Sequence, residues 1–160
     1  MTNQKNQPQK NKHGFTIIEV VLVLAIAGLI FLMVFIALPA LQRSQRDTQR
    51  RDDMALFAAQ ITQYQANNGN QIPSSWSDFI TNYVKDIKDP STGLAYTIDG
   101  TITDCSTATN CKQKSSDDVG VIHIYTNATC NGETPTKRAG GNNIAFTMKL
   151  EGAGIYCGHN

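Results

Sequence analysis

The sequence predicts an α+β protein built from one long N-terminal helix and a small antiparallel β-sheet. Residues 20–38 form an uninterrupted apolar run, and apolar side chains then recur at helical spacing as far as residue 64. After residue 69, short segments alternate between apolar and polar residues, as strands with one buried face do. We therefore expect a helix over residues 15–68 and a globular β-rich head over residues 69–160.

The apolar run is long enough to cross a bilayer. As a helix, residues 20–38 would span roughly 28 Å, and the hydrocarbon core of a membrane is ~30 Å thick. A buried core helix is the alternative, but a run that is apolar on every side needs lipid or a much larger protein around it. We expect residues 20–38 to cross the membrane once, with the N-terminus in the cytoplasm. Pro39 follows the run and marks a point where the helix can bend.

The second half of the long helix carries one apolar stripe. Met54, Phe57, Ile61 and Tyr64 recur at spacings of three and four residues. The stripe is predicted to pack on the sheet of the head. The helix is expected to stop at residues 67–69, Asn-Asn-Gly, where the glycine can adopt a left-handed conformation.

A group of arginines follows the apolar run. Two interpretations are open: these side chains pair with acids on adjacent helices, or they form a solvated face with local pairs such as Asp47–Arg51. The group comprises Arg43, Arg46, Arg50 and Arg51.

The head begins with a short helix after Ser74 and Ser75, which can cap it. Residues 89–93, DPSTG, form a strong turn signal. Strands are predicted at 94–98, 119–125, 144–150 and 155–157, with one polar face toward solvent. Residues 100–118 and 127–143 are expected to be long polar loops, and His123 is expected to point to solvent.

The cysteines all lie in the second half of the chain, at Cys105, Cys111, Cys130 and Cys157. An even number in a small polar domain after a membrane segment predicts disulfides in an oxidising compartment. Four cysteines permit three connectivities. One of them pairs Cys130 with Cys157 and Cys105 with Cys111, and the alternatives stay open.

Composition and motifs argue against an enzyme. The formal net charge is +1, so no global field favours a nucleic-acid partner. The sequence contains no phosphate-binding glycine loop, no HExxH helix and no GxSxG elbow. The histidines lack ligand spacing. We expect no catalytic, cofactor-binding or metal site, and no cofactor.

The most informative segment is residues 12–30, KHGFTIIEVVLVLAIAGLI. An ordinary secretory signal places its apolar region before the cleavage site. Here the plausible cut, after Gly14, comes before the apolar region. A small-x-small pattern at residues 25–27 offers another cut, which would leave ten apolar residues on the mature chain.

Glu19 is the one acid at the edge of the apolar run. A central carboxylate costs on the order of 2–3 kcal/mol on membrane-insertion scales, and less near the interface. Cleavage after Gly14 would make Phe15 a free amine, which could neutralise Glu19 of a neighbouring copy. The alternative is a carboxylate that reaches the cytoplasmic interface and has no role.

Residues 14–19, Gly-Phe-Thr-Ile-Ile-Glu, preceded by Lys12 and followed by the apolar run, resemble the prepilin signal of type IV pilins and pseudopilins. The resemblance implies a leader peptide over residues 1–14, cut by a prepilin peptidase that also methylates Phe15. It implies that Glu19 aligns subunits through the amine of Phe15, and that the helix can loosen between Gly28 and Pro39. The head resembles pilins of small-genome candidate bacteria in outline.

A pilin-like fold implies a structural subunit of an extracellular type IV pilus-like filament. The chain would wait in the cytoplasmic membrane, and the pilus assembly platform would add it to a helical homopolymer. Adhesion, motility and DNA uptake are alternative roles for such a filament. Two other interpretations remain: a pseudopilin of a type II secretion or DNA-uptake system, and a signal-anchored extracellular binding domain that does not polymerise.

Overall fold

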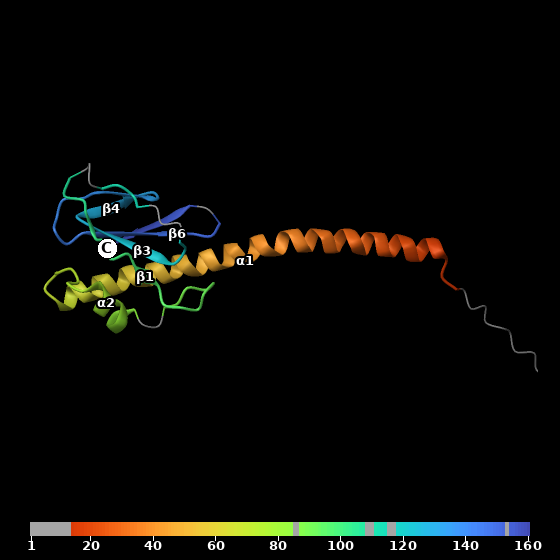
Figure 1. Cartoon of the computed structure of the whole chain (residues 1–160), viewed down its shortest axis with the longest axis horizontal. Coiled ribbons are helices and arrows are strands. Elements are labelled where there is room, and N and C mark those ends of the chain that lie inside the picture. The colour runs from red at the N-terminus through yellow and green to blue at the C-terminus, as the bar shows by residue number, and fades with distance from the viewer. Residues whose placement is uncertain (1–13, 85–86, 108–110, 115–117, 153) are drawn as a thin grey trace, which may run out of the picture. The chain divides into compact units, whose positions relative to one another are not determined.

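The computed structural model describes residues 14–84, 87–107, 111–114, 118–152 and 154–160 (Figure 1). The predicted leader, residues 1–14, lies outside these residues except for Gly14. The fold is α+β, with helices α1 and α2 followed by seven short strands among the described residues. The chain divides after Pro39 into two compact units.

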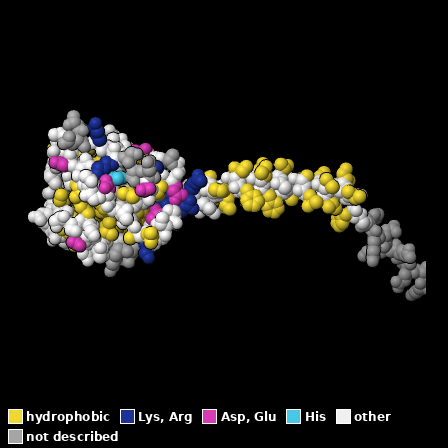
Figure 2. Space-filling view, viewed as in Figure 1, with side chains coloured by type: hydrophobic (Ala, Val, Ile, Leu, Met, Phe, Trp, Pro, Cys, Tyr) yellow, Lys and Arg dark blue, Asp and Glu magenta, His cyan; other side chains and the backbone are white. Residues whose placement is uncertain are grey.

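Helix α1 runs over Ile17–Asn67 and includes Pro39. Its start lies two residues after the predicted one and its end one residue before. It contains a segment long and apolar enough to cross a membrane, and none of that segment is buried (Figure 2). The predicted stop is confirmed: Gly69 has φ +62°, and the amide of Asn70 donates to the carbonyl of Gln65 at 2.7 Å.

The core of the head forms along the predicted stripe of α1. Met54, Phe57 and Ile61 are fully buried. The ring of Phe57 meets that of Phe146 edge-on, with centroids 5.0 Å apart. Tyr64 is only partly buried and lies at the margin of this core. The apolar face of α1 therefore supplies one wall of the head.

The main sheet has the order β1-β3-β6-β7, and β2 also pairs with β3. Its strands are β1 (Thr97–Ile98), β2 (Thr103–Asp104), β3 (Val121–Thr126), β6 (Ile144–Lys149) and β7 (Ile155–His159). Strands β3, β6 and β7 are antiparallel, as predicted.

Strands β1 and β2 are parallel to β3, so the prediction of a purely antiparallel sheet is wrong. Residues 105–120 separate β2 from β3 in the sequence, and a connection of that length, unlike a tight hairpin, allows parallel pairing. The predicted strand 94–98 shortens to β1, with one isolated bridge between Lys88 and Ala95.

The predicted loop 127–143 contains a hairpin, β4 (Ala128–Asn131) and β5 (Thr134–Lys137). The second face of the main sheet was predicted to be polar and solvated, and that prediction is wrong because this hairpin covers the face. Ala145 and Thr147 point to that face and are fully buried. Ala145 belongs to a second small core with Cys105, Tyr125 and Ala128.

His123 also lies on the second face, and its predicted exposure to solvent is wrong. Only 6% of the residue is exposed, and its Nδ1 lies 3.1 Å from Oδ2 of Asp99. The same carboxylate oxygen pairs with Nζ of Lys114 at 3.0 Å. This polar network therefore holds Asp99 and Lys114 against His123 of the sheet.

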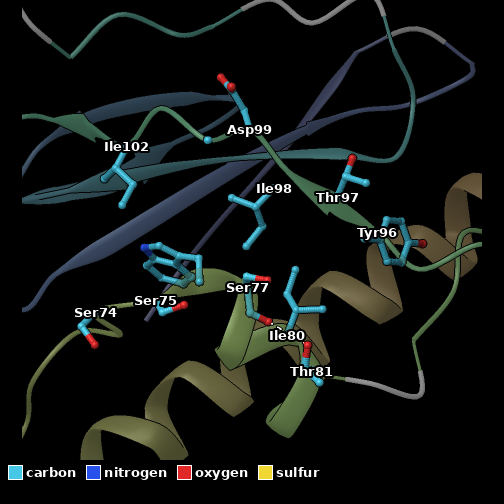
Figure 3. A pocket seen from close by; sticks show the side chains of 12 residues that line it. Ser74, Ser75, Ser77, Ile80, Thr81, Tyr96, Thr97, Ile98, Asp99 and Ile102 are labelled. Atoms are coloured by element: carbon cyan, nitrogen blue, oxygen red, sulfur yellow. Dashed lines mark hydrogen bonds between the residues drawn. The ribbon is translucent and has the colours of Figure 1, made fainter.

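Helix α2 (Trp76–Tyr83) begins at the predicted cap, because the side chain of Ser75 accepts from the amide of Asp78. Trp76 and Phe79 are buried against Phe57 of α1. Between the start of α2 and the segment 96–102 lies a groove of about 580 Å³ (Figure 3).

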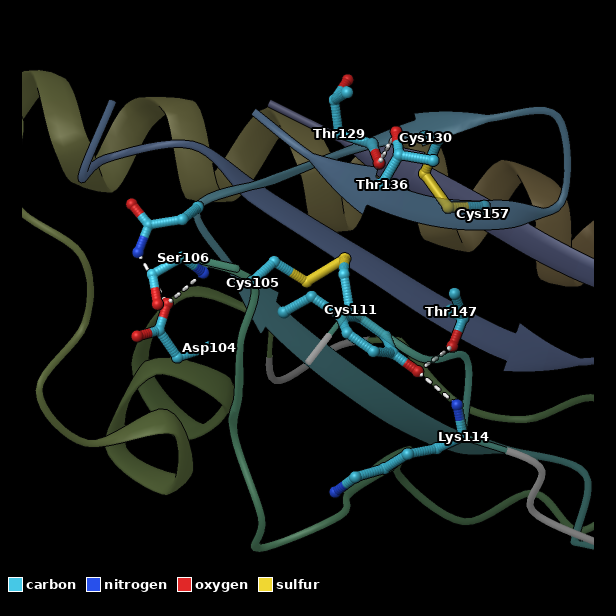
Figure 4. Close-up of a disulfide and its surroundings, with 12 residues drawn as sticks. Asp104, Cys105, Ser106, Cys111, Lys114, Thr129, Cys130, Thr136, Thr147 and Cys157 are labelled. Atoms are coloured by element: carbon cyan, nitrogen blue, oxygen red, sulfur yellow. Dashed lines mark hydrogen bonds between the residues drawn. A yellow bond between two sulfur atoms is a disulfide. The ribbon is translucent and has the colours of Figure 1, made fainter. Parts of the chain in front are cut away.

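Two disulfides fix the elements that cover the second face (Figure 4). Cys105 is bonded to Cys111, six residues away, and Cys130 to Cys157, 27 residues away. The second bond joins the hairpin strand β4 to the edge strand β7. The structure thus adopts one of the three connectivities that the sequence permits.

Replacing Cys130 and Cys157 by serine should destabilise the head more than replacing Cys105 and Cys111. The longer closed loop removes more entropy from the unfolded chain: about 3–4 kcal/mol for the first pair against about 2 kcal/mol for the second. Denaturant titration of the full chain in detergent measures both. Equal losses, or a larger loss for Cys105 and Cys111, would contradict this ranking.

Candidate processing and assembly site

The candidate cleavage point precedes α1. Gly14 and Phe15 are exposed and lie outside the helix, with Phe15 88% exposed. A peptidase requires an accessible peptide bond that is free of helical hydrogen bonds, and the bond between these two residues meets that condition in the described chain.

Glu19 closes the N-terminus of α1. Its Oε2 accepts from the amide of Thr16 at 3.1 Å and from Oγ1 of Thr16 at 3.0 Å. In return, Oγ1 of Thr16 accepts from the amide of Glu19 at 3.4 Å. This reciprocal arrangement is a capping box. Sequence reasoning missed it, although the spacing Thr-x-x-Glu before an apolar run is its signal.

Only one oxygen of the Glu19 carboxylate is occupied by the cap. Among the described residues, no hydrogen bond to Oε1 is found. The carboxylate borders a shallow, mainly apolar hollow lined by Phe15, Val20, Val23 and Leu24. The arrangement leaves a carboxylate oxygen beside apolar surface, where a cation from outside the chain would be weakly screened.

Gly28 and Pro39 both lie inside α1, which is helical through each of them. A side chain placed at Gly28 would meet nothing within 4 Å, so packing within the chain does not require glycine there. Pro39 lacks an amide hydrogen and removes one helical hydrogen bond. A loosening of this part of the helix stays a prediction.

The second unit contains a cluster of charges that sequence reasoning did not find. Arg50 is fully buried and reaches three carboxylates. Its Nε lies 2.6 Å from Oδ2 of Asp89, its Nη1 3.0 Å from Oδ1 of Asp47, and its Nη2 2.7 Å from Oε1 of Glu151. Nη2 also donates to Oγ of Ser91 at 3.0 Å.

Two further contacts complete this ionic cluster. Both Nε and Nη2 of Arg46 donate to Glu151, the latter at 2.5 Å. Asp47 accepts from the amides of Glu151 at 2.9 Å and Gly152 at 2.7 Å. The cluster therefore ties α1 to the turn at residues 89–93 and to Glu151 and Gly152, which follow β6.

The interpretation of a solvated face is wrong at Arg50, which is buried and pairs with acids of its own chain, and Arg46 also pairs within the chain. Pairing of the other arginines with acids on adjacent helices stays a prediction. Asp47 pairs with Arg50 and not with Arg51. Burial would raise the pKa of Asp89, but hydrogen bonds from Arg50 and Ser91 outweigh it and hold that pKa well below its usual value. The hydrogen bond from Arg46 likewise lowers the pKa of Glu151.

The N-terminal segment matches a known family model. Residues 9–35 match the family described as "Prokaryotic N-terminal methylation motif". The matched segment contains Gly14, Phe15, Glu19 and most of the apolar run, and the motif is characteristic of prepilin signals. No curated protein and no solved structure matches the chain. The N-terminal segment is therefore of the type IV pilin and pseudopilin kind, and it indicates anchoring in a membrane.

Replacing Arg50 by methionine should lower the free energy of unfolding by about 3–5 kcal/mol, because three buried or half-buried carboxylates lose their shared cation. The neighbouring Arg51 is exposed, and Arg51→Met should stay within about 0.5 kcal/mol of the parent chain. Denaturant titration in detergent measures both variants. Similar losses of unfolding free energy for the two variants would show that the ionic cluster does not contribute to the stability of the head.

Proposed function

We propose that this chain is a structural subunit of a type IV pilus-like filament. The observation that carries the proposal is the methylation motif at residues 9–35, which overlaps the start of α1, together with the apolar segment of that helix, none of which is buried. Apolar side chains left uncovered by their own chain need lipid or other helices around them. A subunit that is stored in the membrane and then polymerises through this helix has lipid around it first and other helices afterwards.

The proposed sequence of events begins with residues 1–14 as the leader. A prepilin peptidase cuts after Gly14 and methylates the amine of Phe15, while residues 20–38 hold the chain in the cytoplasmic membrane. The assembly platform then transfers the subunit into an extracellular helical homopolymer. The apolar part of α1 forms its core, while the amphipathic part stays packed on the head, residues 69–160, which faces outward.

The capping box gives Glu19 a defined state before assembly. Oε2 bonded to Thr16 keeps the carboxylate at the helix start, where the positive end of the helix dipole favours it. The other oxygen can then accept the amine of Phe15 from a neighbouring copy. The pair forms as lipid is replaced by helices, in apolar surroundings where charges are weakly screened.

A pseudopilin of a secretion or DNA-uptake system would carry the same signal. The two functions differ in abundance, since a filament subunit should dominate fibres sheared from cells and a pseudopilin should be nearly absent from them. Adhesion and motility would be properties of the finished fibre.

We expect mass spectrometry of the mature chain to find Phe15 at the N-terminus, carrying one methyl group. Gly14→Ala should slow the cut and Gly14→Leu should abolish it, because the peptidase must accommodate the residue before the cleaved bond. A matched control is Ser44→Leu, an exposed position in the second half of α1. A mature chain that keeps residues 1–14 in cells with an active prepilin peptidase would refute the proposal and favour a signal-anchored domain.

Replacing Glu19 separates its charge from its role in the cap. Glutamine still accepts from Thr16 but lacks the charge, whereas alanine loses both. If pairing with Phe15 drives assembly, Glu19→Gln and Glu19→Ala should both insert and be cut normally, yet both should reduce sheared fibres at least about tenfold. Normal fibres from Glu19→Gln would assign Glu19 to the cap alone.

A further inference from the structure

The turn at residues 89–93 is held more firmly than a surface turn requires. Oδ1 of Asp89 accepts from the amides of Ser91 at 2.9 Å and Thr92 at 3.1 Å. Arg50 holds the other oxygen of Asp89 at 2.6 Å and also binds Ser91. The buried ionic cluster therefore fixes the turn from beneath.

This rigid turn presents an exposed leucine. Leu94 is 69% exposed, the highest value among the large apolar side chains described after Pro39. Its amide donates to Oγ1 of Thr92, its carbonyl accepts from the amide of Asp89, and Gly93 has φ +70°. An apolar side chain on a fixed backbone loses little entropy when it docks, which favours binding.

The groove between α2 and the segment 96–102 offers a matching surface (Figure 3). Its apolar lining comes from Trp76, Ile80, Ile98 and Ile102, and short hydroxyl side chains stand at its rim. Asp99 is its one charged lining residue. That carboxylate is engaged by Lys114 and His123. The volume of about 580 Å³ exceeds what one leucine side chain occupies.

Leu94 and the groove are held by contacts to different positions along α1. The turn before Leu94 is tied to Arg50, whereas Trp76 in the groove stacks on Phe57 at 6.5 Å. Seven residues separate these points on α1, which corresponds to about 10 Å of helix rise. Two different surfaces that meet head to tail generate an open series of copies, whereas a self-complementary patch closes at a dimer.

We propose that Leu94 of one copy inserts into the groove between α2 and the segment 96–102 of the next copy, as a contact between heads. The inference rests on the proposed filament and names a second copy of this chain as the occupant of the groove. Helices would hold the core of the fibre, and this contact would set the spacing of its heads.

Cysteine cross-linking of the full chain in its producing cells tests the contact. The described cysteines are all in disulfides. A chain that carries Leu94→Cys and Ser77→Cys therefore adds two thiols, one in place of the exposed leucine and one among the residues that line the groove. Sheared fibres should give a ladder of dimers, trimers and longer species without reductant. Each single substitution, and the control pair Leu94→Cys with Glu133→Cys, should give none.

A second measurement uses the same position without cross-linking. Leu94→Asp should reduce sheared fibres about tenfold, since one buried leucine contact is lost. Leu94→Met should leave the yield unchanged, and both variants should still begin at Phe15. Normal Leu94→Asp fibres with no ladder, a ladder that stops at dimers, or equal ladders from the control pair would overturn this contact while the filament stands. A parent chain that forms no fibres would refute both proposals.

Discussion

The structure depends first on a constraint at its N-terminus: residues 20–38 carry no charge, and the chain itself buries none of that helix. Fully covering each large apolar side chain is worth roughly 1.5–3 kcal/mol. Such a segment is stable only inside lipid or against other apolar helices. That constraint explains the methylation motif that covers most of this run, the single acid at the edge of the run and the accessible bond between Gly14 and Phe15.

The head satisfies different requirements and does so within one chain. Its core is largely aromatic and aliphatic, built on Phe57 and the residues around it. The ionic cluster around Arg50 fixes which segments of the head contact α1, because a buried guanidinium is tolerated only when every partner is in place. Residues 89–93, Glu151 and Gly152 are thereby held at fixed positions on α1. The disulfides do the same for the second face of the sheet, where a small core around Tyr125 would be too thin to hold its cover alone.

Local patterns predicted the parts of this structure that are set locally. The long helix, its stop at Gly69, the cap at Ser75 and the burial of Met54 and Phe57 all follow from spacing and propensity. The Thr-x-x-Glu signal of the capping box was equally legible and was overlooked. The partners of Arg50 could not be foreseen, because Asp89 and Glu151 lie 39 and 101 residues away in the sequence.

On the proposed function, the apolar part of α1 stays out of water both before and after assembly. A single cysteine in place of Leu29 tests it directly, because the described native cysteines are all in disulfides. We expect a water-soluble maleimide to leave this thiol unlabelled in intact membranes and in sheared, detergent-free fibres, and to label it after denaturation. Rapid labelling in intact fibres would show that this segment meets water in the fibre, and it would contradict the proposed assembly through the apolar helix.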